Sequence, residues 1–153
     1  MRAKKGANVM LTFFSKILVA YDGSELAEKA LKTALKLAMQ DKHIELHIVF
    51  VVKPMPRLDK MEVETRRVWD LRKVRAQRML EDVKASVEGM GNQVIVSALE
   101  GQPGTKLVEY AAHTGIDLIV MGCRGLSGLK ELFLGSVSHY VVQHSRVPAF
   151  IVK

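Results

Sequence analysis

The feature that most restricts the fold of this chain is a regular alternation of short apolar runs with segments of helical periodicity. Five strand-like runs occur, and a segment with apolar residues at helical spacing lies between each run and the next. This alternation predicts an open, doubly wound parallel sheet with right-handed crossovers and helices on both faces, which is an α/β fold. The expected strands are residues 16–21, 44–52, 93–99, 117–121 and 148–152, and the expected helices are residues 25–38, 62–88, 105–113 and 136–144.

The length and composition are those of one ordinary domain. The chain has 153 residues, of which 48% are hydrophobic and 25% charged, and this suits a single substantial core. No linker or low-complexity tract divides it. We therefore expect one domain over residues 16–153, preceded by a loosely ordered extension over residues 1–15. The extension faintly resembles a secretion signal, but Lys16 interrupts its apolar stretch and the next residues are needed for the first strand.

Cysteine content and hydropathy indicate where such a chain resides. Cys123 is the single cysteine, so no intrachain disulfide can form. No apolar run approaches the ~20 residues that a membrane-spanning helix needs. We expect a cytoplasmic protein that does not contact a membrane.

The net charge of +7 is concentrated in two segments. Residues 1–16 contribute +4, and residues 57–78 contribute another +4 from eight basic and four acidic side chains. The remainder is close to neutral, which disfavours a general nucleic-acid-binding surface. We interpret the basic segment as the solvated face of a helix. The alternative is a contact for RNA, DNA or an acidic partner, and an exposed Trp69 would strengthen it.

Four glycines lie within residues 122–135, between the fourth expected strand and the last expected helix: Gly122, Gly125, Gly128 and Gly135. Glycine lets main-chain N–H groups approach an anion, and a helix start adds unpaired donors and a partial positive charge. We interpret the stretch as a cradle for nucleotide phosphates, at the end of a strand where open α/β sheets bind ligands. The alternative is a long surface loop, since glycine also marks ordinary turns.

Other nucleotide-binding patterns fit the chain poorly. A Rossmann or flavodoxin-like site would place its phosphate loop after the first strand, where the chain has Asp22-Gly23-Ser24. No Walker A sequence is present, and Glu100 is a poor match to the acidic acceptor of a receiver domain. What remains is a site shared between the glycine loop and Asp22, whose carboxylate suits ribose hydroxyls. Val51 could contact an adenine, and Asp22 could instead merely cap the helix that follows it.

With these features the chain resembles the universal stress protein family over residues 16–153. The nucleotide-binding signature of that family is Gly, two residues, Gly, nine residues, Gly, then Ser or Thr. The chain carries the signature complete as Gly122, Gly125, Gly135 and Ser136. Three further stretches match the family, at Asp22-Gly23-Ser24, at Gly101-Gln102-Pro103 and at residues 117–122.

The resemblance implies the strand order 3-2-1-4-5, with ATP bound where the order reverses. It also implies an antiparallel homodimer through the C-terminal strand, residues 147–152. A divalent cation such as Mg²⁺ on the phosphates would fit, although no acidic cluster marks a place for it. By position, Ala20, Tyr21, Asp22 and Val51 would surround adenine and ribose, and Met121, Gly122, Arg124, Gly125, Gly135, Ser136, Val137 and Ser138 would hold ribose and phosphates.

The leading functional hypothesis is an ATP-binding stress-response protein that acts as a regulatory switch on a partner that the sequence does not name. Nothing in the sequence positions a general base or an attacking water, so we expect at most slow ATP hydrolysis. One alternative is an ATPase or nucleotidyl-transfer enzyme that uses the same cleft. Another is a scaffold or nucleic-acid binder that uses residues 57–78.

The single cysteine and the histidines also bear on the possible chemistry. Cys123 departs from the family, in which serine is commoner at this position. It either fills a small space or is a redox-sensitive thiol beside the phosphate site. None of the five histidines is spaced with another ligand as in a zinc site, so we expect no structural zinc.

Overall fold

The computed structural model describes residues 13–54, 63–126 and 134–153. Most of the extension predicted at residues 1–15 therefore lies outside the described residues. Gly128 of the glycine loop and residues 57–62 of the basic segment lie outside them as well. Within the described ranges, no helix combines the length and the apolar character needed to cross a membrane.

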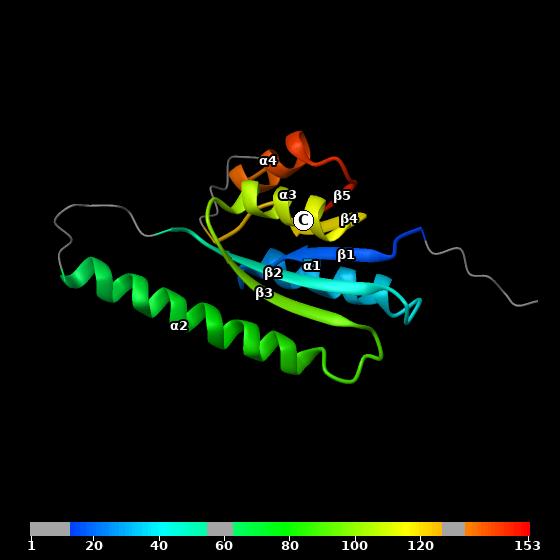
Figure 1. Ribbon diagram of the computed structural model, residues 1–153, viewed down its shortest axis with the longest axis horizontal. Coiled ribbons are helices and arrows are strands. Elements are labelled where there is room, and N and C mark those ends of the chain that lie inside the picture. The colour runs from blue at the N-terminus through cyan, green and yellow to red at the C-terminus, as the bar shows by residue number, and fades with distance from the viewer. Residues whose placement is uncertain (1–12, 55–62, 127–133) are drawn as a thin grey trace, which may run out of the picture.

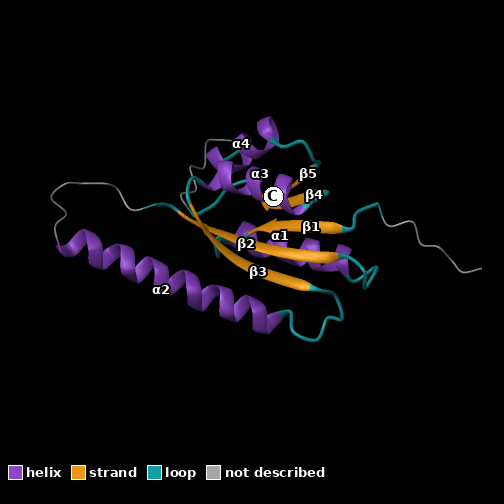
Figure 2. Ribbon diagram, viewed as in Figure 1, coloured by secondary structure: helices purple, strands orange, loops and turns teal. Residues whose placement is uncertain are grey.

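Five parallel strands form one sheet in the order β3-β2-β1-β4-β5 (Figure 1 and Figure 2). The order reverses at β1, which pairs with β2 on one side and with β4 on the other. Both the parallel sheet and its strand order are therefore confirmed. The strands are β1 (Lys16–Ala20), β2 (Glu45–Val52), β3 (Val94–Glu100), β4 (Leu118–Gly122) and β5 (Ala149–Val152).

Helices cover both faces of the sheet, as the alternation predicts (Figure 1). α1 (Glu25–Ala38) and α2 (Val63–Ser86) lie on one face, and α3 (Pro103–Thr114) and α4 (Ser136–His144) lie on the other. Because successive side chains of a strand point to opposite faces, each inner strand contributes to two cores.

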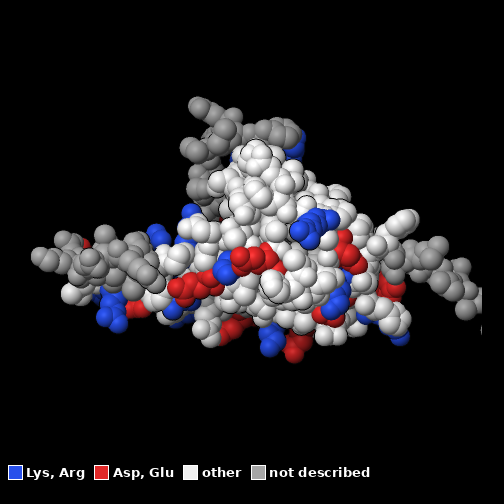
Figure 3. All heavy atoms as spheres, turned by 45° about the horizontal axis from the view of Figure 1, so that its top comes forward, with Lys and Arg blue, Asp and Glu red and all other residues white. Residues whose placement is uncertain are grey.

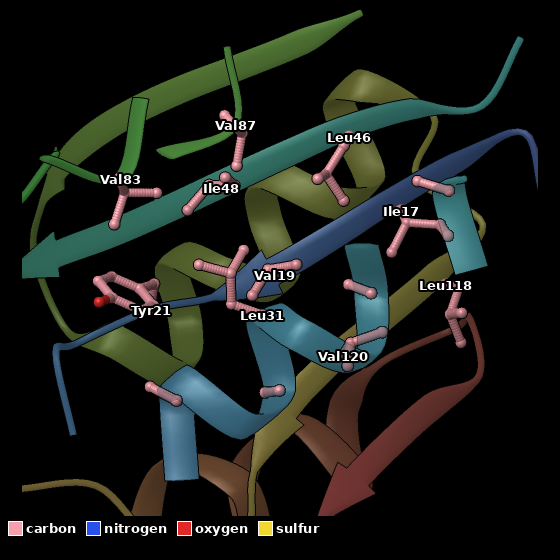
Figure 4. Packing of buried hydrophobic residues seen from close by; sticks show 14 of the residues in the cluster. Ile17, Val19, Tyr21, Leu31, Leu46, Ile48, Val83, Val87, Leu118 and Val120 are labelled. Carbon is pink, nitrogen blue, oxygen red and sulfur yellow. The ribbon is translucent and has the colours of Figure 1, made fainter. Parts of the chain in front are cut away.

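β1 shows this division most clearly. Ile17 and Val19 pack toward α1, in the cluster that Figure 4 shows, whereas Leu18 packs toward α3 and α4. All three side chains are completely buried. The central strand is therefore held between two apolar layers.

Local signals set the helix ends, with small shifts from the sequence expectation. Ser24 caps α1 as predicted, since its hydroxyl oxygen accepts a hydrogen bond from the main-chain N–H of Ala27 at 3.2 Å. α3 begins at Pro103, two residues earlier than expected, because proline fits the first turn of a helix. It ends at Thr114 and is capped by Gly115, whose φ of 70° is the left-handed conformation that glycine adopts readily.

A carboxylate ties β1 to β4 at the start of both strands. Asp117 accepts hydrogen bonds from the main-chain N–H groups of Ser15 and Lys16, at 2.7 and 3.0 Å, and from the Ser15 hydroxyl at 2.7 Å. These bonds join the residue just before β4 to the start of β1. They therefore help to fix the register of two strands that are far apart in sequence.

Candidate functional site

The carboxyl ends of β1 and β4 lie side by side, where the strand order reverses. Ala20 at the end of β1 pairs with Met121 of β4, so the turns that follow the two strands leave the sheet together. In doubly wound sheets, this edge is the place where ligands bind. The structure therefore brings together the two segments that the sequence analysis selected, residues 22–24 and the glycine loop.

The Asp22 carboxylate joins these two segments. Its Oδ1 accepts a hydrogen bond from the N–H of Ser24 at 3.0 Å, and its Oδ2 accepts one from the N–H of Leu126 at 3.2 Å. The first bond closes the turn before α1, but the side chain that caps this helix is that of Ser24, so Asp22 does not have the capping role that the alternative interpretation gave it. The second bond reaches a residue 104 positions away and fixes the start of the glycine loop. Asp22 therefore holds the turn after β1 and the glycine loop together, independently of which ligand the site binds.

Two glycines of the signature are required by close packing. A Cβ on Gly125 would lie 2.5 Å from Oδ2 of Asp22, and a Cβ on Gly122 would lie 2.8 Å from the Cβ of Leu26 in α1. Both distances are shorter than real Cβ contacts. The absence of side chains therefore lets the loop lie directly against the turn after β1. Leu26 is a contact that sequence reasoning missed, because an apolar residue in the first turn of a helix carries no distinctive pattern.

The N-terminus of α4 is open. Gly135 occupies the N-cap position with no side-chain cap, so the first N–H groups of α4 receive no side-chain acceptor there. Ser136 is exposed and Val137 is half-buried. An uncapped helix start presents donors and a partial positive charge, which is the arrangement that favours a phosphate group.

Ser138 is more deeply buried than a side chain that binds phosphate would be. Its side chain is 2% exposed, and its hydroxyl is 2.7 Å from the carbonyl oxygen of Cys123 and 3.0 Å from that of Gly135. A hydroxyl has one proton to donate, and here backbone carbonyls receive it. The Gly135 N–H also donates to the Cys123 carbonyl, at 2.7 Å. Ser138 thus locks α4 onto the end of β4, and its main-chain N–H is what it can offer to a ligand.

Tyr21 contributes main chain rather than side chain to this edge. Its ring lies in the core beside Leu31 and Val83 (Figure 4). Its hydroxyl group donates a hydrogen bond to Glu28 of α1. Burial raises the pKa of the Tyr21 hydroxyl above its ordinary value, and the neighbouring Glu28 carboxylate raises it further.

The remaining predicted residues differ in how accessible they are. Met121 is buried in the core under α3 and α4, and Ala20 and Val51 pack against the same cluster while staying partly exposed. Arg124 is partly exposed in the loop after β4. Apolar surface at this edge therefore comes from Ala20 and Val51, on the α3 and α4 side of the sheet.

The Cys123 thiol is closed off from solvent. The residue is 2% exposed, its N–H donates to the carbonyl of Val152 at 2.8 Å, and its own carbonyl is occupied by α4. These contacts favour the interpretation of Cys123 as a small residue in a small space, because a reactive thiol needs access to solvent.

The described residues contain no group of three or more His, Cys, Asp or Glu side chains that could hold a metal ion. Two histidines are nevertheless paired with carboxylates, the exposed His43 with Asp41 and the buried His47 with Glu45, which the spacing did not indicate. His47 is 3% exposed, with Nε2 2.6 Å from Oε1 of Glu45 and Nδ1 2.8 Å from the hydroxyl of Tyr110. Glu45 and His47 lie two residues apart and therefore on the same face of β2, at the far end of the sheet from the candidate site. They form a structural network between the sheet and α3.

An all-parallel sheet of this order, with a glycine loop and an open helix start at its reversal point, defines a class of α/β proteins with a ligand site at that edge. Within this class the chain belongs to the universal stress protein family, whose family model matches residues 13–153. It is 36% identical to universal stress protein YxiE of Bacillus subtilis, over 92% of this chain and 99% of that one.

Solved structures share the fold. The protein MJ0577 of Methanocaldococcus jannaschii superposes with a TM-score of 0.80 at 32% identity, over 91% of this chain and 95% of that one. A universal stress protein in complex with cAMP superposes with a TM-score of 0.69 at 24% identity, over 92% and 97% of the two chains. These likenesses confirm both the fold and the family that the glycine signature indicated.

Proposed function

We propose that the edge between β1 and β4 binds ATP. The observation that carries the proposal is the pairing of an uncapped α4 N-terminus with a loop that Asp22 holds against the turn after β1. Phosphates would lie on the first N–H groups of α4, near Ser136 and Val137. Ribose hydroxyls would lie near Asp22, and adenine would contact the apolar surface of Ala20 and Val51. The solved relative with cAMP bound is a nucleotide complex of the same fold.

The remaining predicted residues have supporting roles in this proposal. Gly122 and Gly125 allow the loop to approach the turn, and Gly135 leaves the helix start open. Arg124 would supply positive charge, and Met121 and Ser138 hold the floor of the site in place. Tyr21 would offer main-chain groups alone. A divalent cation would be bound mainly by the phosphates themselves, because the described residues hold no group of ligands for one.

ATP would act here as a regulatory ligand rather than as the substrate of a fast enzyme. Among the described residues that we assign to the site, the only carboxylate is Asp22, which main-chain N–H groups hold in the turn after β1 and which we place at the ribose rather than at the phosphates. A general base needs a free acceptor directed at the attacking water. We therefore propose a nucleotide-dependent switch with slow hydrolysis at most, acting in the cytoplasm on a protein partner. Turnover that releases ADP or AMP repeatedly would favour the alternative, an ATPase or nucleotidyl-transfer enzyme.

The proposed homodimer would form through β5. Among the described residues this strand ends the sheet and pairs with β4 alone, and Phe150 is 49% exposed on it. An apolar edge strand pairs readily with another strand. Replacing Phe150 with Asp should convert a dimer into a monomer in sedimentation-velocity experiments. A dimer that persists unchanged would contradict this assignment.

The first test of ATP binding is mass spectrometry of the nucleotide that gently purified protein releases on denaturation. ATP in an amount comparable to the protein would support a slow switch. An empty protein that also fails to bind added ATP in calorimetric titration would refute the assignment.

The second test places a negative charge where the phosphates should lie. Ser136→Asp adds an acid to the first turn of α4, which the helix dipole tolerates well, so the variant should fold at least as stably as the parent. It should nevertheless bind ATP about tenfold or more weakly, because a unit charge opposes the phosphates at short range. Ser136→Asn is the matched neutral control and should bind nearly normally. Equal ATP affinities of the two variants would show that the phosphates do not bind at the N-terminus of α4.

A further inference from the structure

The first half of α2 packs little against the rest of the described molecule. The buried side chains of this helix, Ala76 and Val83, belong to its middle and second half. Before Ala76, Trp69 is half-buried and every other side chain that the structure describes is exposed. Figure 1 shows the N-terminal end of α2 extending beyond the strands of the sheet. About four turns of helix are therefore presented to solvent.

This exposed half carries an apolar stripe. Val68, Leu71 and Val74 follow one another at intervals of three residues and are 50, 62 and 51% exposed. Residues spaced three and four apart lie on one side of a helix. Single exposed apolar residues are common on protein surfaces, but a contiguous set marks an interaction site. The stripe is the strongest such feature among the described helices.

The stripe borders a hollow between α1 and α2 with a volume of 730 Å³. Leu31 of α1 and Met79 and Val83 of α2 supply apolar surface within it, and Leu71 and Val74 form part of its wall. A hollow of this size accommodates several side chains of a docked segment. Stripe and hollow together form an apolar groove along α2, which we name the α1–α2 groove.

The exposed first half of α2 beside the groove is positively charged, whereas the hollow itself is lined by two basic and two acidic side chains. These are Arg75, Arg78, Glu28 and Asp82, and neither arginine forms an ion pair with another described residue. The described part of the basic segment, residues 63–78, has six basic and two acidic side chains. Figure 3 shows Lys and Arg interspersed with Asp and Glu over the face that it presents. An occupant of the groove should therefore carry carboxylates that flank its apolar residues.

The same surface is poorly suited to nucleic acid. Trp69 is the one aromatic residue of α2, and Lys73 Nζ lies 3.7 Å from the centre of its ring. The cation covers one face of a ring that is already half-buried, which leaves less aromatic surface for a base to stack on. Exposed valine and leucine side chains add nothing to phosphate binding, but they are the anchors that an amphipathic helix uses.

We propose that the α1–α2 groove docks an amphipathic, acidic helix of a partner protein. Apolar side chains of the partner would lie on Leu71 and Val74 and enter the hollow toward Leu31, and its carboxylates would pair with Arg75 and Arg78. The groove does not include the open end of α4, so docking needs no nucleotide and is tested without it.

The probe is a fluorescein-labelled synthetic helix of about 18 residues, with leucines along one side and glutamates flanking them. We expect fluorescence anisotropy to detect saturable binding to the parent protein. The double variant Leu71→Gln/Val74→Gln should weaken binding about tenfold or more, as anchor residues do. Both side chains are more than half exposed, so folding should not suffer. Val142→Gln, at a 50% exposed position of α4, is the matched control and should bind normally.

Charge reversal supplies a second, independent readout. Arg75→Glu/Arg78→Glu should reject the glutamate peptide and accept a version in which lysines replace the glutamates. Equal binding of a sequence-scrambled peptide, or full binding by the Leu71→Gln/Val74→Gln variant, would overturn the proposal. A single-stranded oligonucleotide that binds more tightly than the peptide and depends on the same arginines would assign the surface to nucleic acid instead. Self-association that Leu71→Gln abolishes would assign it to a second copy of the chain.

Discussion

Substitution of Gly125 by alanine tests whether the glycine loop depends on direct contact with Asp22. The new Cβ would lie 2.5 Å from Oδ2 of Asp22, so it must move by about 0.9 Å to reach an ordinary contact of 3.4 Å. The hydrogen bond from the Leu126 N–H to the same oxygen is already 3.2 Å long and would break.

The cost can be estimated from these two effects. Crowding of a well-packed contact costs about 1–3 kcal/mol. The lost bond adds little, about 0.5–1 kcal/mol, because Leu126 is 66% exposed and water can replace its partner. A loss of about 2 kcal/mol should lower Tm by about 4–8 °C in a domain of this size. The same strain in the loop should weaken ATP binding by up to about thirtyfold.

A double-mutant cycle separates this contact from a general effect of adding a methyl group. Unfolding free energies from urea titration are measured for Gly125→Ala, Asp22→Ala and the double variant. Without the Asp22 carboxylate the Cβ has room, so Gly125→Ala should then cost less than about 0.5 kcal/mol. Gly91→Ala is the control. Its φ of 81° makes alanine unfavourable, but nothing lies within 4 Å of the new Cβ, so its cost should be equal in both backgrounds. An equal cost of Gly125→Ala in both backgrounds would refute the contact.

Three further changes probe the supporting structure. Ser138→Ala should cost about 0.5–1.5 kcal/mol of unfolding free energy in urea titration, because the Cys123 carbonyl loses one of its two donors and keeps the Gly135 N–H; an unchanged midpoint would contradict this. His47→Ala should cost about 2–4 kcal/mol by breaking the buried network with Glu45, whereas His43→Ala, at a side chain 81% exposed, should change stability by no more than about 0.5 kcal/mol. The raised pKa of Tyr21 means that the folded state holds this proton more tightly than the unfolded state. Its contribution is complete below the ordinary tyrosine pKa of about 10 and falls as pH rises above it. Tyr21→Phe should therefore make stability depend less on pH above about 10, and identical slopes for parent and variant would count against this role.

The fold could be predicted from the sequence because every strand and helix carries an apolar pattern, although in α2 the buried part of that pattern is confined to the middle and second half. The run Ile17 to Val19 is apolar on both faces, and the structure buries both faces. Ser24 is a strong N-cap type, and it caps α1 as expected. The strand order is less accessible from pattern alone, since periodicity does not say which strands pair. The family signature supplied it.

The parts of the site that could not be predicted depend on main-chain contacts or on side-chain direction. The bond from Leu126 to Asp22 uses a backbone N–H, which every non-proline residue possesses, so no residue type marks it. The inward direction of Tyr21 follows from the alternation of β1, in which residues 17, 19 and 21 share one face. The alternation therefore predicts that the Tyr21 side chain points into the core. Tyr21 is assigned to the site from its match to the family, which does not take the direction of the side chain into account.

The two carboxylates that tie β1 to β4 also bear on how the chain is made. Asp22 and Asp117 each bridge more than one hundred residues, because the central strand of the sheet comes first in the chain and its partner β4 comes near the end. While the protein is being synthesised, β1 can pair with β2 long before β4 exists. Until then one edge of this apolar strand is unpaired and open to association with other chains. Truncated chains that end before β4 should accordingly aggregate or occupy chaperones, and the binding edge should be among the last parts of the molecule to form.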